Sequence, residues 1–165
     1  MDHCDLFAKL AAAWAAEGHE HARPATDDDI AAFESRYAVR LPSDLRTYFA
    51  TVNGGALGHD GSMDHEMISF WRLDQVRSQL ELNEGKGGRD DLFGFAEWSI
   101  DCHTYEIQLH GDPGLETPIV IDYGSELQKV AGSFSEFIAA YLRCDDAVLY
   151  GVNRSRSGSE AGPSA

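Results

Sequence analysis

Residues 41–55 of the chain read Leu-Pro-Ser-Asp-Leu-Arg-Thr-Tyr-Phe-Ala-Thr-Val-Asn-Gly-Gly. Proline suits the first turn of a helix, and a serine side chain there can accept a hydrogen bond from a free backbone N–H. Apolar residues then recur at intervals of three and four. This spacing forms one apolar stripe on a helix, made of Leu45, Tyr48, Phe49 and Val52. Asparagine and glycine tolerate the left-handed conformation that ends a helix, so Asn53-Gly54-Gly55 closes it. The stretch predicts a short amphipathic helix packed on a core, followed by a tight turn.

Four further helices are predicted around this stretch. One covers residues 3–17, and the next begins after Thr26, where three consecutive aspartates suit the positive end of a helix. Apolar residues at helical spacing indicate a third helix over residues 73–83. The last begins at the capping-box sequence Ser133-Phe134-Ser135-Glu136 and carries an apolar stripe as far as Leu142.

The second half of the chain changes to the period of strands. Strands are predicted at residues 67–71, 92–98, 104–109, 118–123 and 127–130. Alternation in one of them places Tyr105 and Ile107 on the same face and turns Glu106 toward solvent. Helices first, then closely spaced strands, then a helix predict an α+β fold. In it, N-terminal helices and a C-terminal helix pack on a mainly antiparallel sheet of about five or six strands.

The length of 165 residues suits a single domain. We expect this domain to occupy residues 1–150, because residues 151–165 are rich in Ser, Gly and Arg and have the composition of a disordered tail. The sequence contains no apolar run of membrane-spanning length, and its acidic start lacks the apolar region of a signal peptide. Three widely spaced cysteines form no disulfide pattern, which is typical of reduced thiols in a cytoplasmic protein.

The chain is strongly acidic: 28 Asp and Glu against 13 Lys and Arg give a formal net charge of −15. This charge disfavours nucleic acid and anionic membranes as partners and favours cationic ones, although acidic surfaces also occur simply as soluble surfaces. No Lys or Arg lies between Arg89 and Lys129. We therefore predict a negative surface on the sheet and its turns, with the partner-binding residues Asp90, Asp91, Glu97, Asp101, Glu106 and Asp112.

The quoted helix and turn, Leu-Pro-x-x-Leu-x-x-Tyr followed by Asn-Gly-Gly, resemble the N-terminal signature of the SUKH superfamily. Two later strings, Phe-Ala-Glu-Trp at residues 95–98 and Val-Ala-Gly-Ser-Phe-Ser-Glu-Phe at residues 130–137, are also similar to that family's pattern. The resemblance spans residues 26–149. It implies the family's α+β fold. It also implies a binding function, because the superfamily includes bacterial immunity proteins that neutralise toxins and a fungal cell-wall regulator.

Two groups of reactive side chains bear on catalysis and metal binding. Residues 59–66 hold two histidines and three acids, which are ligands for a divalent cation. They match no standard metal motif, so a solvated loop is the preferred interpretation. Cys102 and His103 suggest a nucleophile and its base, but neighbours on a strand point to opposite faces and cannot pair. We therefore predict no catalytic residue, no metal and no cofactor.

The resemblance thus implies a non-enzymatic immunity protein, and the charge adds the expectation that its acidic surface covers the basic cleft of a cognate toxin domain, such as a nuclease. Two alternatives remain open. One is a regulatory or scaffolding module that binds several proteins weakly. The other is a small hydrolase that depends on a metal held by His59 and His65, and its activity would be lost on replacing either histidine with alanine.

Overall fold

The computed structural model describes residues 2–56, 58, 63–99, 102–112, 114–124 and 126–151. Its helices are α1 (His3–Ala16), α2 (Asp27–Tyr37), α3 (Ser43–Thr51), α4 (Gln79–Leu82), α5 (Phe134–Tyr141) and α6 (Asp146–Leu149). Its strands are β1 (Ile68–Phe70), β2 (Arg77–Ser78), β3 (Leu92–Trp98), β4 (His103–Gln108), β5 (Ile119–Asp122) and β6 (Leu127–Ala131). Of the predicted tail, residues 151–165, all but Gly151 lie outside the described residues.

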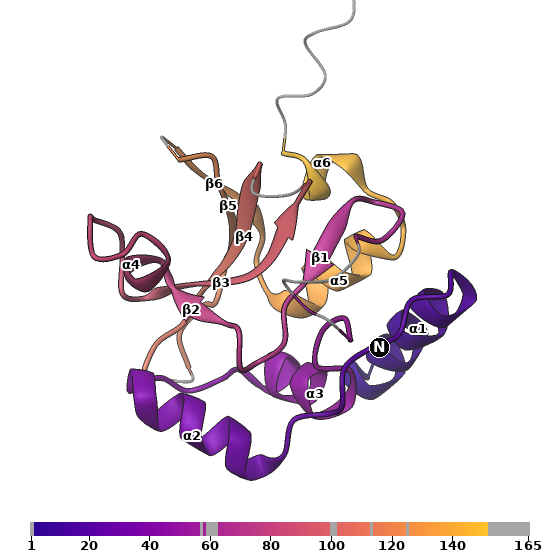
Figure 1. Cartoon of the computed structure of the whole chain (residues 1–165), viewed down its shortest axis with the longest axis horizontal. Helices are drawn as coiled ribbons and strands as arrows, with labels where there is room; N and C mark the ends of the chain where they lie inside the picture. The colour runs from indigo at the N-terminus through magenta and orange to yellow at the C-terminus, as the bar shows by residue number, and fades with distance from the viewer. Residues whose placement is uncertain are drawn as a thin grey trace, which may run out of the picture.

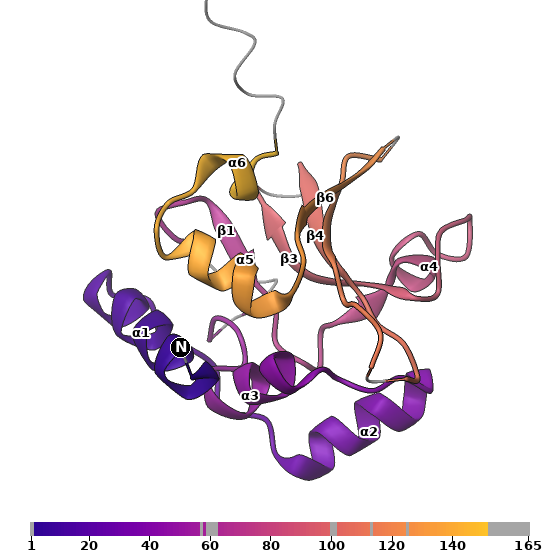
Figure 2. The same ribbon diagram turned by 180° about the vertical axis from the view of Figure 1, so that it is seen from behind.

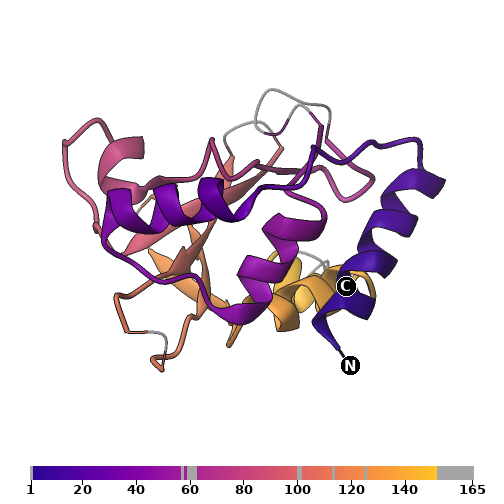
Figure 3. The same cartoon turned by 90° about the horizontal axis from the view of Figure 1, so that it is seen from below.

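The strands form one six-stranded sheet in the order β1-β3-β4-β5-β6, and β2 also pairs with β3. Every strand pairing is antiparallel. Helices α1, α3 and α5 contact one another beside one face of the sheet (Figures 1 and 2). Figure 3 shows α1, α2 and α3 together in front, in the view from below. The predicted α+β fold is confirmed.

The core lies between these helices and the inner face of the sheet. Tyr105 and Ile107 point into it from β4, as the alternation predicts, and both are fully buried. The Tyr105 ring lies 5.1 Å from the ring of Phe137 on α5. On α2, Phe33 contacts Phe93 of β3 at a ring separation of 5.8 Å. Aromatic pairs of this kind add to the free energy gained from burial alone.

The turn after α3 connects three segments of the chain. Asn53 donates from Nδ2 to the carbonyl of Arg23 and accepts at Oδ1 from the amide of Leu73. Gly54 follows with φ +79°, and a Cβ added there would lie 2.5 Å from the carbonyl oxygen of Trp71. Only glycine combines this backbone conformation with so close an approach. The Asn-Gly-Gly signature therefore has a structural reason.

The start of α3 differs from the prediction that Ser43 caps it. The N-cap is Pro42, and no side chain caps this end. The polar group that matters is Asp44, which is buried. Its Oδ1 accepts from the amide of Leu45 at 2.8 Å, and its Oδ2 accepts from the amide of Ser135 at 2.8 Å. Asp44 thus connects the first turns of α3 and α5.

Asp44→Ala is expected to lower the free energy of unfolding by about 2 kcal/mol. The change leaves the partly buried backbone amide of Ser135 without its hydrogen-bond acceptor. It also removes a carboxylate from the N-terminal ends of α3 and α5, which carry partial positive charge. Ser43→Ala is the matched control, with an expected change within about 0.5 kcal/mol, since Ser43 is exposed and its side chain makes no cap. Urea denaturation of both variants measures the difference. Equal losses would mean that the Asp44 bridge contributes nothing.

The helix predicted over residues 73–83 is wrong for most of its length. Only Gln79–Leu82 is helical, although its C-cap is Asn83, near the predicted end. Residues Arg77 and Ser78 instead form β2 and pair with Gly94 and Phe93. Residues 77–78 form backbone hydrogen bonds with the edge of β3 in place of those of a local helix. This tertiary pairing overrides the helical propensity that the apolar spacing indicates.

Candidate functional site

Four acidic residues lie at one end of the sheet, where β3 begins and β4 leads into β5. We call Asp90, Asp91, Asp112 and Glu116 the acidic end. The amide of Leu109 donates to the carbonyl of Asp91 at 2.9 Å, which holds the two chain segments together. Asp90, Asp112 and Glu116 are exposed. Asp91 is half-buried and accepts two hydrogen bonds from Arg89, which hold the pKa of its carboxyl below the usual range.

The other three predicted residues do not join this surface. Asp101 lies outside the described residues. Glu97 is buried on β3, with 6% of its surface exposed. Glu106 is 1% exposed, so the prediction that it faces solvent is wrong. The structure therefore brings together Asp90, Asp91 and Asp112 of the predicted set and separates Glu97 and Glu106 from them.

Glu106 is buried because α4 covers the outer face of the sheet. Gln79 of α4 donates from Nε2 to Glu106 Oε2 at 3.1 Å and to Asp122 Oδ2 at 3.0 Å. Beside it, the side chains of Trp71 and Leu82 lie within 3 Å of where a Cβ on Gly94 would stand. Burial raises the pKa of Glu106 to about 8, and the nearby Asp122 carboxylate acts in the same direction. The alternation of β4 correctly places Glu106 on the face opposite Tyr105 and Ile107, but it does not predict that α4 covers that face.

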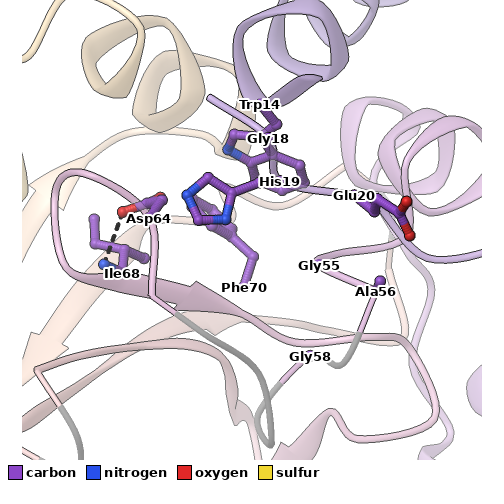
Figure 4. Close-up of a pocket in the computed structure, with 10 residues that line it drawn as sticks. All are labelled: Trp14, Gly18, His19, Glu20, Gly55, Ala56, Gly58, Asp64, Ile68 and Phe70. Carbon is purple, nitrogen blue, oxygen red and sulfur yellow. Dashed lines mark hydrogen bonds between the residues drawn. The ribbon is translucent and has the colours of Figure 1, made fainter. Parts of the chain in front are cut away.

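A cavity of about 380 Å³ lies between the end of α1 and the segment that leads into β1. The side chains of Trp14, His19 and Asp64 lie around it (Figure 4). Trp14 Nε1 donates to the hydroxyl of Tyr141, which donates to Asp64 Oδ2 at 2.6 Å. Burial raises the pKa of Asp64, although the hydrogen bonds from Tyr141 and from the Ile68 amide oppose it. These contacts connect α1 and α5 to the entry of β1.

A second hollow, of about 600 Å³, runs along α2 and is lined by four arginines, which we call the arginine groove: Arg23, Arg36, Arg72 and Arg77. Arg36 pairs with Glu81 at 2.9 Å, and Arg72 pairs with Asp74 at 3.0 Å. Nothing in the linear sequence distinguishes these arginines, because they are spread over more than fifty positions. Asp29 and Asp74 also line this hollow, so its walls carry four guanidinium groups and two carboxylates.

The reactive groups weighed from the sequence separate in the structure. Cys102 is exposed, whereas His103 is buried and stacks on the indole of Trp98 at a ring distance of 5.2 Å. Burial lowers the pKa of His103 to about 4, so its ring is neutral at pH 7. His59 and Asp60 lie outside the described residues. His65 and Glu66 lie beside Cys144, a neighbour that no local pattern predicts.

The chain is similar to one family of known proteins. The family model for the SMI1 / KNR4 family (SUKH-1) matches residues 24–140. No curated protein matches the sequence. Among the described residues, no helix combines the length and apolar character needed to cross a membrane.

Proposed function

The chain belongs to the SMI1 / KNR4 family (SUKH-1), and on this premise we propose that it is a cytoplasmic binding protein of the immunity type. It acts without catalysis: it binds a cognate toxin domain and covers a basic cleft that the toxin needs for its own activity. A nuclease is the toxin class that fits best, because a cleft that binds phosphates is basic and accepts carboxylates in their place.

The observation that carries this proposal is the acidic end. Among the described residues, no Lys or Arg comes within 4.0 Å of the carboxylates of Asp90 and Asp112. Glu116 has only a loose contact of 4.0 Å with Lys129. Asp90, Asp112 and Glu116 can therefore meet a cationic partner without first breaking a strong ion pair, whereas Asp91 is already paired with Arg89 at 2.6 Å. Their charge is part of the chain's net charge of −15, which accelerates encounter with a basic surface at low ionic strength.

The double variant Asp90→Lys/Asp112→Lys is expected to slow association with the toxin domain by about 10-fold or more at low salt. Dissociation changes less, because exposed charges act mainly on encounter. The control is Asp5→Lys/Glu126→Lys, which makes the same change in net charge at two exposed positions outside the acidic end. Surface-immobilised toxin and a salt series measure both rates. If both variants slow association equally, net charge alone drives encounter, and the acidic end is not the contact.

The partner is first identified by using the tagged chain as bait in lysate of its source cells, with washes at low and high salt. Production of the captured domain in a bacterial host, alone and together with this chain, then tests protection. The proposal predicts that the domain alone stops growth and that co-production restores it. A partner whose production is harmless would overturn the immunity function.

A second candidate is a scaffolding module, and the arginine groove favours it. An acidic segment of another protein suits a groove lined by four arginines, whereas a basic toxin cleft does not. In the capture experiment, a scaffold retains several proteins below stoichiometric amounts. Their binding is then weakened by Arg23→Glu, whose guanidinium has only a 3.8 Å contact with Asp29, and not by Asp90→Lys/Asp112→Lys.

A further inference from the structure

Three side chains with different metal-binding atoms meet where the chain enters β1. His65 and Glu66 precede β1, and Cys144 follows α5, 79 positions after His65. The distance from His65 Nε2 is 3.4 Å to Glu66 Oε1 and 3.9 Å to Cys144 Sγ. One atom from each of the three residues lies within 4.8 Å of the others. We call these residues the His65 cluster.

These separations suit one small cation. Bonds of about 2.0–2.3 Å to nitrogen, oxygen and sulfur, at tetrahedral angles, place neighbouring ligand atoms about 3.3–3.6 Å apart. The separations of His65 Nε2 from its two neighbours, 3.4 and 3.9 Å, differ from these values by only a few tenths of an ångström, and the third pair, Glu66 and Cys144, lies within 4.8 Å. Imidazole, carboxylate and thiolate together are a set that zinc accepts, whereas calcium and magnesium prefer oxygen alone.

Neighbouring groups already orient two of these three side chains. Glu17 Oε2 lies 2.8 Å from His65 Nδ1 and accepts a hydrogen bond from a proton there, which leaves Nε2 as the ring nitrogen that faces Glu66 and Cys144 and that a cation would bind. The hydroxyl of Tyr150 donates to Glu66 Oε2 at 2.6 Å, which leaves Oε1 on the side of His65. Such outer contacts typically accompany histidine and carboxylate ligands of metals.

A thiol, an imidazole and a carboxylate in contact are also the groups of a catalytic cysteine, its histidine base and the residue that orients the base. A nucleophile needs a thiolate and an electropositive setting. Here two carboxylates lie against the imidazole that neighbours Cys144: Glu17 at 2.8 Å and Glu66 at 3.4 Å from His65. This electronegative setting opposes a free thiolate and favours a bound cation, which would take the place of the thiol proton.

We propose that His65, Glu66 and Cys144 bind one Zn²⁺ ion, with a fourth coordination position open to water. The site joins the segment before β1 to the end of α5, and through Glu17 it is braced by the end of α1. Bound zinc therefore stabilises the contact between α1 and α5. This inference concerns the chain alone and does not depend on toxin binding.

Titration of the metal-free full chain with Co²⁺, followed by Zn²⁺, tests the site. The chain carries no polyhistidine tag. We expect one equivalent of Co²⁺ to give the thiolate-to-cobalt charge-transfer band and the intense visible bands of tetrahedral cobalt, and Zn²⁺ to remove them. Zn²⁺ alone should raise the melting temperature by about 5–10 °C when its free concentration is about 100 times the dissociation constant.

Variants separate this site from the other thiols. Cys144→Ser should abolish the charge-transfer band, and Cys102→Ser, which changes another exposed thiol, should keep it. His65→Ala should weaken Zn²⁺ binding by more than about 100-fold, and Glu17→Gln by about 10-fold or more. Since His65 and Cys144 are exposed, circular dichroism of the metal-free variants should match the parent. The proposal is overturned if no band forms, if the band survives Cys144→Ser, or if Cys144 reacts rapidly with iodoacetamide at pH 7 in a manner that needs His65.

Discussion

Gly54→Ala is expected to lower the free energy of unfolding by about 4 kcal/mol, although it adds a single methyl group. The residue has φ +79°, and a left-handed conformation costs an alanine about 1–2 kcal/mol. The new Cβ would also lie 2.5 Å from the carbonyl oxygen of Trp71, 2.6 Å from its carbon and 3.0 Å from the amide nitrogen of Arg72. These are backbone atoms, so no side-chain rotation relieves the contact, and overpacking of this kind costs about 1–3 kcal/mol more.

The structure offers a matched control for this prediction. Gly18 has nearly the same backbone angle, φ +78°, and a Cβ added there meets nothing within 4 Å. Gly18→Ala is therefore expected to cost only about 1 kcal/mol, from the conformation alone. Urea denaturation of the two variants separates conformational strain from the clash with Trp71. Similar losses in both would show that the turn moves away from β1 at little cost.

The second large effect concerns pH. Stability of the parent chain is expected to fall as pH rises from about 6.5 to 8, because the folded state keeps a proton on Glu106 that the unfolded state releases. The pKa of Glu106 is raised to about 8 from its ordinary 4.5, so between these values the folded chain binds more protons than the unfolded one. Each pH unit in that range removes up to about 1.4 kcal/mol.

His103 acts in the opposite direction at lower pH. Its pKa is lowered to about 4 from 6.5, so folding requires a neutral ring, and its contribution to stability increases with pH through about 6.5. Its contribution levels off about one pH unit above the unfolded value of 6.5, when the unfolded ring has also lost its proton. The downward slope that remains from about pH 7.5 to 8 therefore reports Glu106 without an opposing change from His103.

Glu106→Gln is expected to flatten this slope and to make the chain about 2 kcal/mol more stable than the parent at pH 8. A glutamine keeps an oxygen for Gln79 Nε2 and removes the repulsion from Asp122. Glu126→Gln, an exposed residue in the turn between β5 and β6, is the control and should leave the slope unchanged. Denaturation at several pH values measures both. A parent slope that is flat or rising above pH 6.5 would contradict the burial of a protonated carboxyl.

Much of the fold follows from local pattern. The stripe of α3 and the alternation around Tyr105 and Ile107 give the element and the buried face together, because the same spacing that packs a core also defines the helix or strand. The sequence could not predict that Gln79 lies on Glu106. Alternation specifies the face of a residue but not whether a distant segment covers that face, and the covering helix has only four residues.

The candidate sites show the same limit more strongly. Asp90 and Asp91 are adjacent in the chain, and their surface position follows from the turn before a strand. The charge run that suggested one continuous acidic surface also included Glu97 and Glu106, which pair into the sheet and become buried. The contact of His65 with Cys144 depends on how α5 docks against the entry of β1, and no local rule contains that information. Only the folded chain reveals the cluster.

Helix α1 lies before the residues by which the family is recognised, 24–140, yet it is part of the core. Phe7 and Leu10 are fully buried, and the indole of Trp14 reaches the hydroxyl of Tyr141 on the last long helix. The segment that the family model recognises is therefore shorter than the segment that folds together around one core. A chain shortened to residues 24–140 would lack Phe7, whose ring packs on that of Phe134 on α5, and would expose the Phe134 ring. The first helix is therefore a structural part of the core and not a removable extension.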